Sequence, residues 1–195
     1  MVTSNSVRWY GLAAVASGVL FTVSEFVAFL VAISEDLDEE ATLEAYAAWS
    51  ALSLFTFALL QVSLIGLYAP QWQIAGTFGW VSFLLAFIGT ALAFFVVLVY
   101  AFIALPLTPS DPEFLGTGPP MAFLLYFPLF SLGWLLVGVV FLRSSLYPRP
   151  AVLLLMAGAV LALYPHPLTN IVFSAAVAWL GLALLLERDS SSEQP

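Results

Sequence analysis

The residue in this sequence best suited to carry chemistry is Glu25, the only charged residue well inside a long apolar segment. Ionisable side chains within membrane-spanning helices are rare, face the bundle interior or water, and often mark ion or proton paths. Glu25 follows Trp9 by sixteen residues, which is about 24 Å along a helix at 1.5 Å per residue. Because desolvation penalises an unpaired charge in lipid, polar neighbours of Glu25 become the first candidates for a functional site.

Tyr164 and four other polar side chains are expected at the depth of Glu25, in the outer half of the membrane. The four others lie late in the third apolar segment, early in the fourth and near the last connection: Tyr100, Tyr126, His166 and Asn170. This arrangement predicts an outward-facing polar pocket around Glu25, with His166 or a tyrosine hydroxyl as its partner. The alternative is that Glu25 only forms a structural hydrogen bond and that His166, which two prolines flank, is a surface-turn residue.

The composition identifies the elements that must position these residues. Hydrophobic residues make up 63% of the 195 residues and charged residues only 8%, whereas soluble domains are about 45–50% apolar and about 25% charged. A chain with so little charge cannot cover a water-facing surface. The lipid bilayer must therefore be its main surroundings.

Six apolar segments are long enough, or nearly so, to cross a bilayer core of about 30 Å, which takes roughly 20 helical residues. They lie near residues 9–33, 45–69, 74–105, 120–142, 147–164 and 168–186. The sequence predicts an all-α polytopic membrane protein, with a bundle of six transmembrane helices in a single domain (residues 1–188) and a polar tail (189–195). The apolar run 151–164 would reach only about 21 Å as a helix, so five spanning helices plus a re-entrant segment are the alternative.

The charged residues predict the orientation of these spans. All four basic residues are arginines, and six crossings place them on one side of the membrane: Arg8, Arg143, Arg149 and Arg188. The acid-containing loops 34–44 and 106–119 then lie on the other side. Because basic residues favour the cytoplasmic side, we expect a multi-pass protein of the cell membrane with cytoplasmic N- and C-termini.

Small residues at helical spacing indicate which helix faces pack together. One stripe on the first span includes Gly11, Ala14, Gly18, Thr22 and Glu25, and one on the last span includes Asn170, Ser174, Ala178 and Gly181. Small side chains let helices approach closely in lipid, so Glu25 is expected to point into the bundle. Such faces also suit contacts between chains, which leaves a homo-oligomer or a partner membrane protein open.

Missing residue types exclude several kinds of chemistry. The chain has no cysteine and no lysine, which rules out disulfides, thiolate catalysis, a lysine Schiff base and a P-loop lysine. One histidine cannot supply an H-E-x-x-H zinc pair or two axial haem ligands. The net charge of −8 disfavours nucleic acid as a partner. We therefore expect no enzymatic activity, no cofactor and no metal site.

Several short motifs are spread along the chain: W-Y-G-L at 9–12, S-G-V-L-F at 17–21, G-L-Y at 66–68, G-T-F-G at 76–79, G-T-A-L at 89–92 and P-R-P-A at 148–151. In these motifs and in its layout the chain resembles a loose group of small, multi-pass, uncharacterised prokaryotic membrane proteins. The resemblance implies an integral membrane protein and lends no catalytic residues.

The sequence thus predicts a non-enzymatic membrane component that is structural, regulatory or able to sense a small ligand. The alternative function is a small transporter coupled to protons or cations through Glu25. A cavity that contains Glu25 and reaches water favours the transporter, whereas apolar surroundings that seal Glu25 favour the structural role.

Overall fold

The computed structural model is helical throughout most of the residues that it describes, 4–34, 39–104, 113–164 and 167–192, and contains no strand among them. The elements in chain order are α1 (Ser4–Ile33), α2 (Glu39–Tyr68), the 3-10 helix η1 (Ala69–Gln71), α3 (Gly76–Val99), the π-helical turn η2 (Tyr100–Ala104), α5 (Glu113–Ser144), α6 (Arg149–Leu161) and α7 (Pro167–Ser192). The predicted class, an all-α helical bundle, is confirmed.

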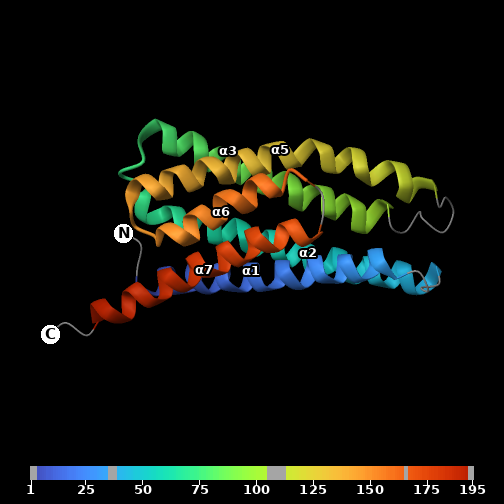
Figure 1. The fold of residues 1–195 in the computed structure, drawn as a ribbon, viewed down its shortest axis with the longest axis horizontal. Coiled ribbons are helices and arrows are strands. Elements are labelled where there is room, and N and C mark those ends of the chain that lie inside the picture. Colours follow the sequence, from blue (N-terminus) through green and yellow to red (C-terminus); the bar gives the residue numbers. More distant parts are fainter. Residues whose placement is uncertain (1–3, 35–38, 105–112, 165–166, 193–195) are drawn as a thin grey trace.

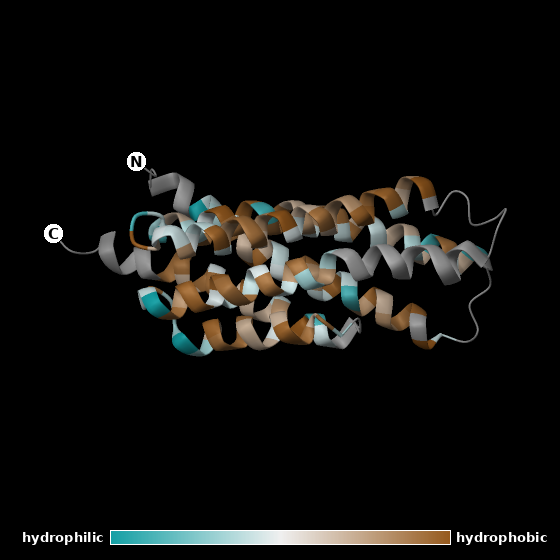
Figure 2. Ribbon diagram, turned by 90° about the horizontal axis from the view of Figure 1, so that it is seen from above, coloured by the Kyte–Doolittle hydropathy of each residue, from teal (hydrophilic) through white to brown (hydrophobic). Residues whose placement is uncertain are grey.

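Five of these helices are long and apolar enough to cross a membrane: α1, α2, α3, α5 and α7. Hydrophobic residues cover most of their length (Figure 2), and helices satisfy their own backbone hydrogen bonds, as lipid requires. The remaining helix, α6, has 13 residues and measures about 20 Å. It starts at one end of the bundle and runs only partway along it before α7 returns to that end (Figure 1).

The six helices form a closed ring in the order α1, α2, α3, α5, α6 and α7, and each packs against the next. The ring closes where α7 packs along α1, which is the most extensive helix contact in the structure. The first and last helices of the chain therefore lie side by side (Figure 1). Residues that are far apart in the sequence can thus share one site.

Small residues bring α1 and α7 close together, as their spacing predicts. A Cβ atom at Gly18 would lie 2.5 Å from the backbone oxygen of Ser174, and one at Gly181 would lie 2.7 Å from the Cβ of Ala14. Only glycine fits at such distances, because the neighbouring atoms are backbone or short side chains. The two helices also share a hydrogen bond of 2.7 Å between the hydroxyls of Thr22 and Ser174. These contacts fix the register of α1 against α7.

The middle of the ring is filled by an aromatic layer, which consists of Phe21, Phe57, Phe130, Trp134 and Phe173. All five side chains are buried, and neighbouring ring centroids lie 5.1–6.4 Å apart in tilted or edge-on contacts. Such arrangements are favourable because the edge of one ring meets the face of another. The indole Nε1 of Trp134 also donates a 3.1 Å hydrogen bond to Thr90 on α3. The layer therefore joins α1, α2, α3, α5 and α7.

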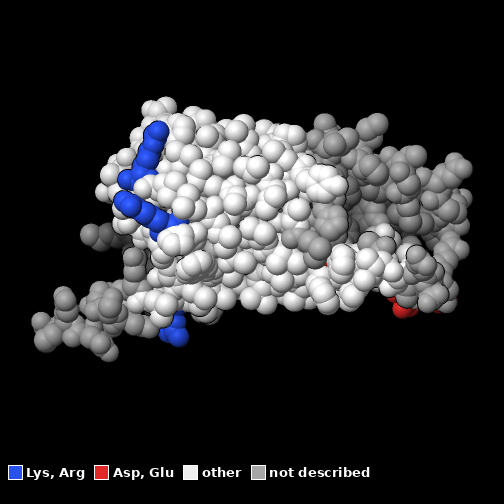
Figure 3. Space-filling model, in the orientation of Figure 1, with Lys and Arg blue, Asp and Glu red and all other residues white. Residues whose placement is uncertain are grey.

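Basic and acidic side chains lie at opposite ends of the bundle (Figure 3). Arg8 near the start of α1, Arg143 in the last turn of α5 and Arg149 at the start of α6 are exposed at one end, which we call the arginine end. Glu40 and Glu44, at the start of α2, are exposed at the other, acidic end. The start of α1 and the end of α7 both lie at the arginine end (Figure 1). For these residues, the predicted separation of charge is confirmed.

Candidate functional site

Glu25 faces the interior of the ring from the second half of α1. Its side chain is only 8% exposed, and so is that of Asn170 in the first turn of α7. The side-chain amide of Asn170 is a close polar neighbour of the Glu25 carboxyl group. The structure therefore places a carboxyl group and an amide together in the interior, across the most extensive helix contact of the ring.

Neighbouring polar contacts hold this part of α1 in position. The bond between Thr22 and Ser174 lies one turn from the Glu25–Asn170 pair along both helices. On another face of α1, the hydroxyl of Ser24 lies 2.8 Å from that of Ser53 on α2. Hydrogen bonds to helices on both sides limit the rotation of α1, so the carboxyl group of Glu25 is held towards the interior.

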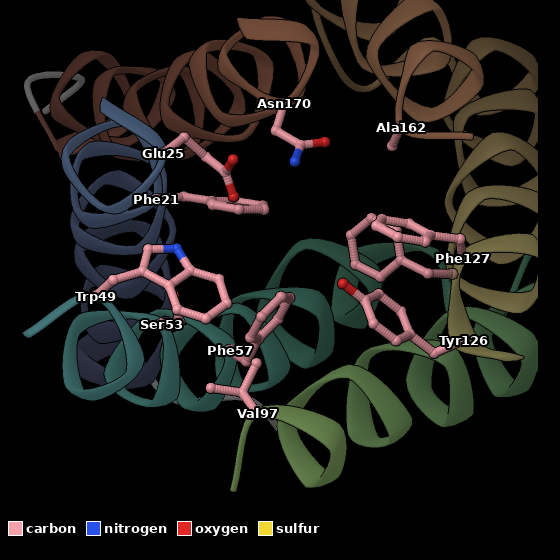
Figure 4. Close-up of a pocket in the computed structure, with 11 residues that line it drawn as sticks. Phe21, Glu25, Trp49, Ser53, Phe57, Val97, Tyr126, Phe127, Ala162 and Asn170 are labelled. Atoms are coloured by element: carbon pink, nitrogen blue, oxygen red, sulfur yellow. The ribbon is translucent and has the colours of Figure 1, made fainter. Parts of the chain in front are cut away.

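A cavity of about 20 Å³ lies beside the Glu25 carboxyl group. This volume suits about one water molecule or an ion of similar size. Figure 4 shows Glu25 and Asn170 on one side of the space, with the Tyr126 hydroxyl pointing into it from the opposite side. Six of the eleven lining residues are aromatic: Phe21, Trp49, Phe57, Tyr126, Phe127 and Phe130. The site is therefore a carboxyl group in a narrow, largely aromatic chamber.

The aromatic layer forms one boundary of this chamber. Phe21, Phe57 and Phe130 belong both to the cavity lining and to the layer. Trp134 lies further along α5 towards the arginine end and packs on Phe130. The side of the chamber nearest to the arginine end is therefore occupied by packed rings.

Two helix ends border the same cavity. Ala162, the C-terminal cap of α6, lines it, and Asn170 contributes to it from the first turn of α7. The N-terminus of a helix carries a partial positive charge and the C-terminus a partial negative charge. Glu25 therefore contacts the positive end of α7, and a negative helix end borders the cavity on the α6 side.

The residues predicted from the sequence are distributed as follows. Glu25, Tyr126 and Asn170 line the cavity together. Tyr100 does not line it: its ring packs against Trp49 and Tyr46, at centroid distances of 5.8 and 6.5 Å. Tyr100 begins the π-helical turn η2, where the wider helical turn changes the direction of side chains. His166 lies outside the residues that the structure describes.

Sequence reasoning missed the contribution of α2 to this site. Trp49, Ser53 and Phe57 all line the cavity. Their spacing of four residues places them on one helix face, and this regular spacing is the signal that could have identified them. Phe21 precedes Glu25 by four residues on α1 and could have been found in the same way.

The chemistry available at this site is the binding of a proton, a water molecule or a small cation. Among the residues described, no group of three or more histidine, cysteine, aspartate or glutamate side chains is placed to hold a metal ion. No protein-family model, curated protein or solved structure matches the chain. The fold and site alone therefore define the class of protein: a helical bundle with five membrane-length helices and one buried carboxyl site.

Proposed function

We propose that this protein is an integral membrane protein that binds a small cation, either a proton or a water-sized monovalent ion, at Glu25. In this proposal it is a ligand-sensing component without enzymatic activity. The observation that carries the proposal is the position of the carboxyl group, which shares a water-sized cavity with the polar side chains of Asn170 and Tyr126.

The number of hydrogen bonds that the Glu25 carboxyl group can accept supports ligand binding rather than a purely structural role. A carboxylate offers about four acceptor sites, whereas an asparagine side chain has only two N–H donors. A hydrogen bond from Asn170, the polar neighbour of Glu25, would therefore leave acceptor capacity beside the cavity. A cation at this position would complete the hydrogen bonding and charge of a group that is costly to bury.

The surroundings of the cavity favour a positively charged ligand. The faces of aromatic rings carry negative electrostatic potential and attract cations, and six aromatic residues line the space. The C-terminal end of α6, at Ala162, adds a partial negative charge. The volume of about 20 Å³ restricts the ligand to the size of a water molecule.

The second candidate function is coupled transport of a proton or cation through Glu25. It is favoured by the position of α6 and α7, whose adjoining ends border the cavity partway along the bundle (Figure 1). Many transporters hold their ions at the ends of discontinuous helices near the middle of the membrane. In this candidate function, the aromatic layer is the closed barrier between the site and the arginine end.

Ion binding can be tested by thermal unfolding of the purified protein in detergent. Sodium chloride should raise the melting temperature of the wild type more than choline chloride does, because a ligand that binds only the folded state stabilises it. Glu25→Gln keeps the side-chain shape and removes the charge, so the difference between the salts should disappear. Glu44→Gln, which changes an exposed acid at the acidic end, is the matched control and should retain it. An equal salt response of the wild type and Glu25→Gln would exclude sodium as the ligand and leave the proton, which the liposome measurement tests.

Flux measurements on the protein in liposomes distinguish the sensing function from the transport function. With an imposed proton or sodium gradient, a transporter should change the internal pH, and Glu25→Gln should slow that change by at least about tenfold, as expected for the loss of about 1.4 kcal/mol of coupling. Indistinguishable traces for the two proteins would remove Glu25 as a coupling residue. Sodium-dependent stabilisation without flux would support the sensing function instead.

We also propose that the protein lies in the cell membrane with the arginine end and both termini in the cytoplasm. The exposed arginines at that end support this orientation through the positive-inside rule. Single cysteines can test it, because the natural chain has none. In intact cells, Glu44→Cys should react with a membrane-impermeant thiol reagent, whereas Arg149→Cys should react only after permeabilisation. The reverse pattern would contradict the orientation.

A further inference from the structure

A second cavity lies at the arginine end, between the start of α3 and the end of α5. Its volume is about 200 Å³, so it can hold a group much larger than one water molecule. Gln71, Phe78 and Arg143 contribute to its walls. Neither the proposed function nor the Glu25 site involves these residues.

Gln71 is an unusual part of this wall because its polar atoms are buried without partners. The side chain is 0% exposed, and neither its amide nitrogen nor its oxygen has a hydrogen-bond partner among the residues described. Burying a polar group without a hydrogen bond costs free energy. A ligand that accepts or donates a hydrogen bond inside the cavity would recover that cost.

Arg143 supplies a positive charge to the same cavity. Its guanidinium carbon lies 5.0 Å from the centroid of the Phe78 ring, so the cation is placed over the aromatic face. The guanidinium group has five N–H donors in a planar arrangement, which suits bidentate hydrogen bonds to phosphate or carboxylate oxygens. The stacking thus positions a group that recognises anions.

The start of α3 adds a second source of positive potential. Its N-terminal cap, Ala75, lines the cavity and makes no side-chain capping hydrogen bond. Backbone N–H groups at a helix N-terminus bind anions, and phosphate in particular. A buried amide, a stacked guanidinium group and an uncapped helix end therefore surround one cavity.

We propose that this cavity binds a phosphate group, carried either by a membrane lipid or by a small soluble molecule. The phosphate oxygens accept hydrogen bonds from Arg143, from the amide nitrogen of Gln71 and from the start of α3. Ile74, which lines the cavity and is 68% exposed, provides an apolar surface next to the anion. That surface suits the first carbons of a lipid chain.

Binding can be measured with the full-length protein in a maltoside detergent, which contains no phosphate. The probes are inorganic phosphate, short-chain phosphatidylglycerol and, as a phosphate-free control, short-chain diacylglycerol. At least one phosphate probe should bind saturably and raise the melting temperature, and diacylglycerol should not. Arg143→Gln should weaken that binding by about tenfold or more, as expected for the loss of a charge-assisted hydrogen bond. Arg149→Gln, an exposed arginine at the same end outside the cavity lining, should change it less than about twofold.

Gln71→Leu provides a test that does not depend on charge. The substitution removes two unpartnered buried atoms, so the unliganded protein should be at least as stable as the wild type. If the amide holds phosphate, binding should nevertheless weaken by about fivefold or more. Unchanged binding in Gln71→Leu would place the phosphate elsewhere and overturn the proposal.

The two probes also separate the two sources of phosphate. Saturable binding of phosphatidylglycerol alone would assign the cavity to a lipid headgroup, and binding of inorganic phosphate alone would assign it to a soluble molecule. Competition between the two would show that the phosphate group is sufficient. The proposal is overturned if neither probe binds saturably, or if Arg143→Gln and Arg149→Gln weaken binding equally.

Discussion

Two cavities of opposite character lie at different depths of this bundle. The cavity near the acidic end measures about 20 Å³ and contains a buried carboxyl group, whereas the one at the arginine end measures about 200 Å³ and contains a guanidinium group. A buried amide also lines each cavity, but Asn170 has the Glu25 carboxyl group as a close polar neighbour. Gln71 has no partner among the residues described. The narrow cavity thus has room only for a water-sized ligand, whereas the wide one has room for a larger external group.

The aromatic layer allows these two environments to coexist in one ring. A continuous water-filled interior would connect the two cavities and would screen the charges in both of them. The packed rings of Phe57, Phe130 and Trp134 instead occupy the section between the cavities. The comparison suggests a division of the molecule into a small cation site and a phosphate site, with a dry partition between them.

The largest expected effect comes from breaking this partition with Trp134→Ala. Trp134 is fully buried and bonded to Thr90, so its truncation should lower the free energy of unfolding by about 3 kcal/mol. Water should then reach the Glu25 chamber from the arginine end. A cysteine introduced at Ser53, which lines the chamber, should gain reactivity towards a small thiol reagent supplied at that end.

The control for this prediction is Trp179→Ala, which truncates a tryptophan that is 44% exposed on the outside of the ring. Its effect on stability should be within about 0.5 kcal/mol, and the cysteine at position 53 should remain protected. Equal effects of the two tryptophan substitutions would show that the aromatic layer is not a partition.

A smaller effect, confined to one cavity, is expected for Gly18→Ala. The added Cβ would lie 2.5 Å from the backbone oxygen of Ser174, so α1 and α7 must move apart, at a cost of about 2 kcal/mol. That movement separates Glu25 from Asn170. The sodium-dependent rise in melting temperature should therefore weaken, while phosphate binding at the arginine end stays unchanged.

Val19→Ala serves as the control for Gly18→Ala because Val19 is a neighbour that is 53% exposed on the outside of the ring. It should leave the sodium and phosphate responses as they are. A loss of both responses in Gly18→Ala would mean that the two cavities are coupled through the fold, and the comparison would need revision.

The sequence alone was enough to predict those features of the fold and site that depend on a local pattern of residues. Long apolar segments predicted the helices, and the spacing of Gly11, Gly18 and Gly181 predicted which faces of α1 and α7 pack. Glu25 could be identified because it is the only charge well inside a span. Asn170 could be placed with it because both share those small-residue faces.

Other parts of the site depend on how the helices rotate and end, which no local pattern determines. Depth along the helix placed Tyr100 level with Glu25, but its ring packs on Trp49 and does not line the cavity. The cavity at the arginine end was missed because Gln71 and Arg143 are brought together by the packing of α3 against α5, and each alone is an ordinary polar residue at a helix end.

The contact between the first and last helices also has a consequence for biosynthesis. Glu25 and Asn170 are separated by 145 residues of chain (170 − 25). At about 5–20 residues per second, the ribosome needs roughly 7–29 seconds to make that stretch. During this interval the nascent α1 must reside in the membrane with its carboxyl group lacking its final partner. Because α7 is synthesised after the other five helices of the ring, it both closes the ring and brings Asn170 to Glu25, so a chain released before α7 would lack both.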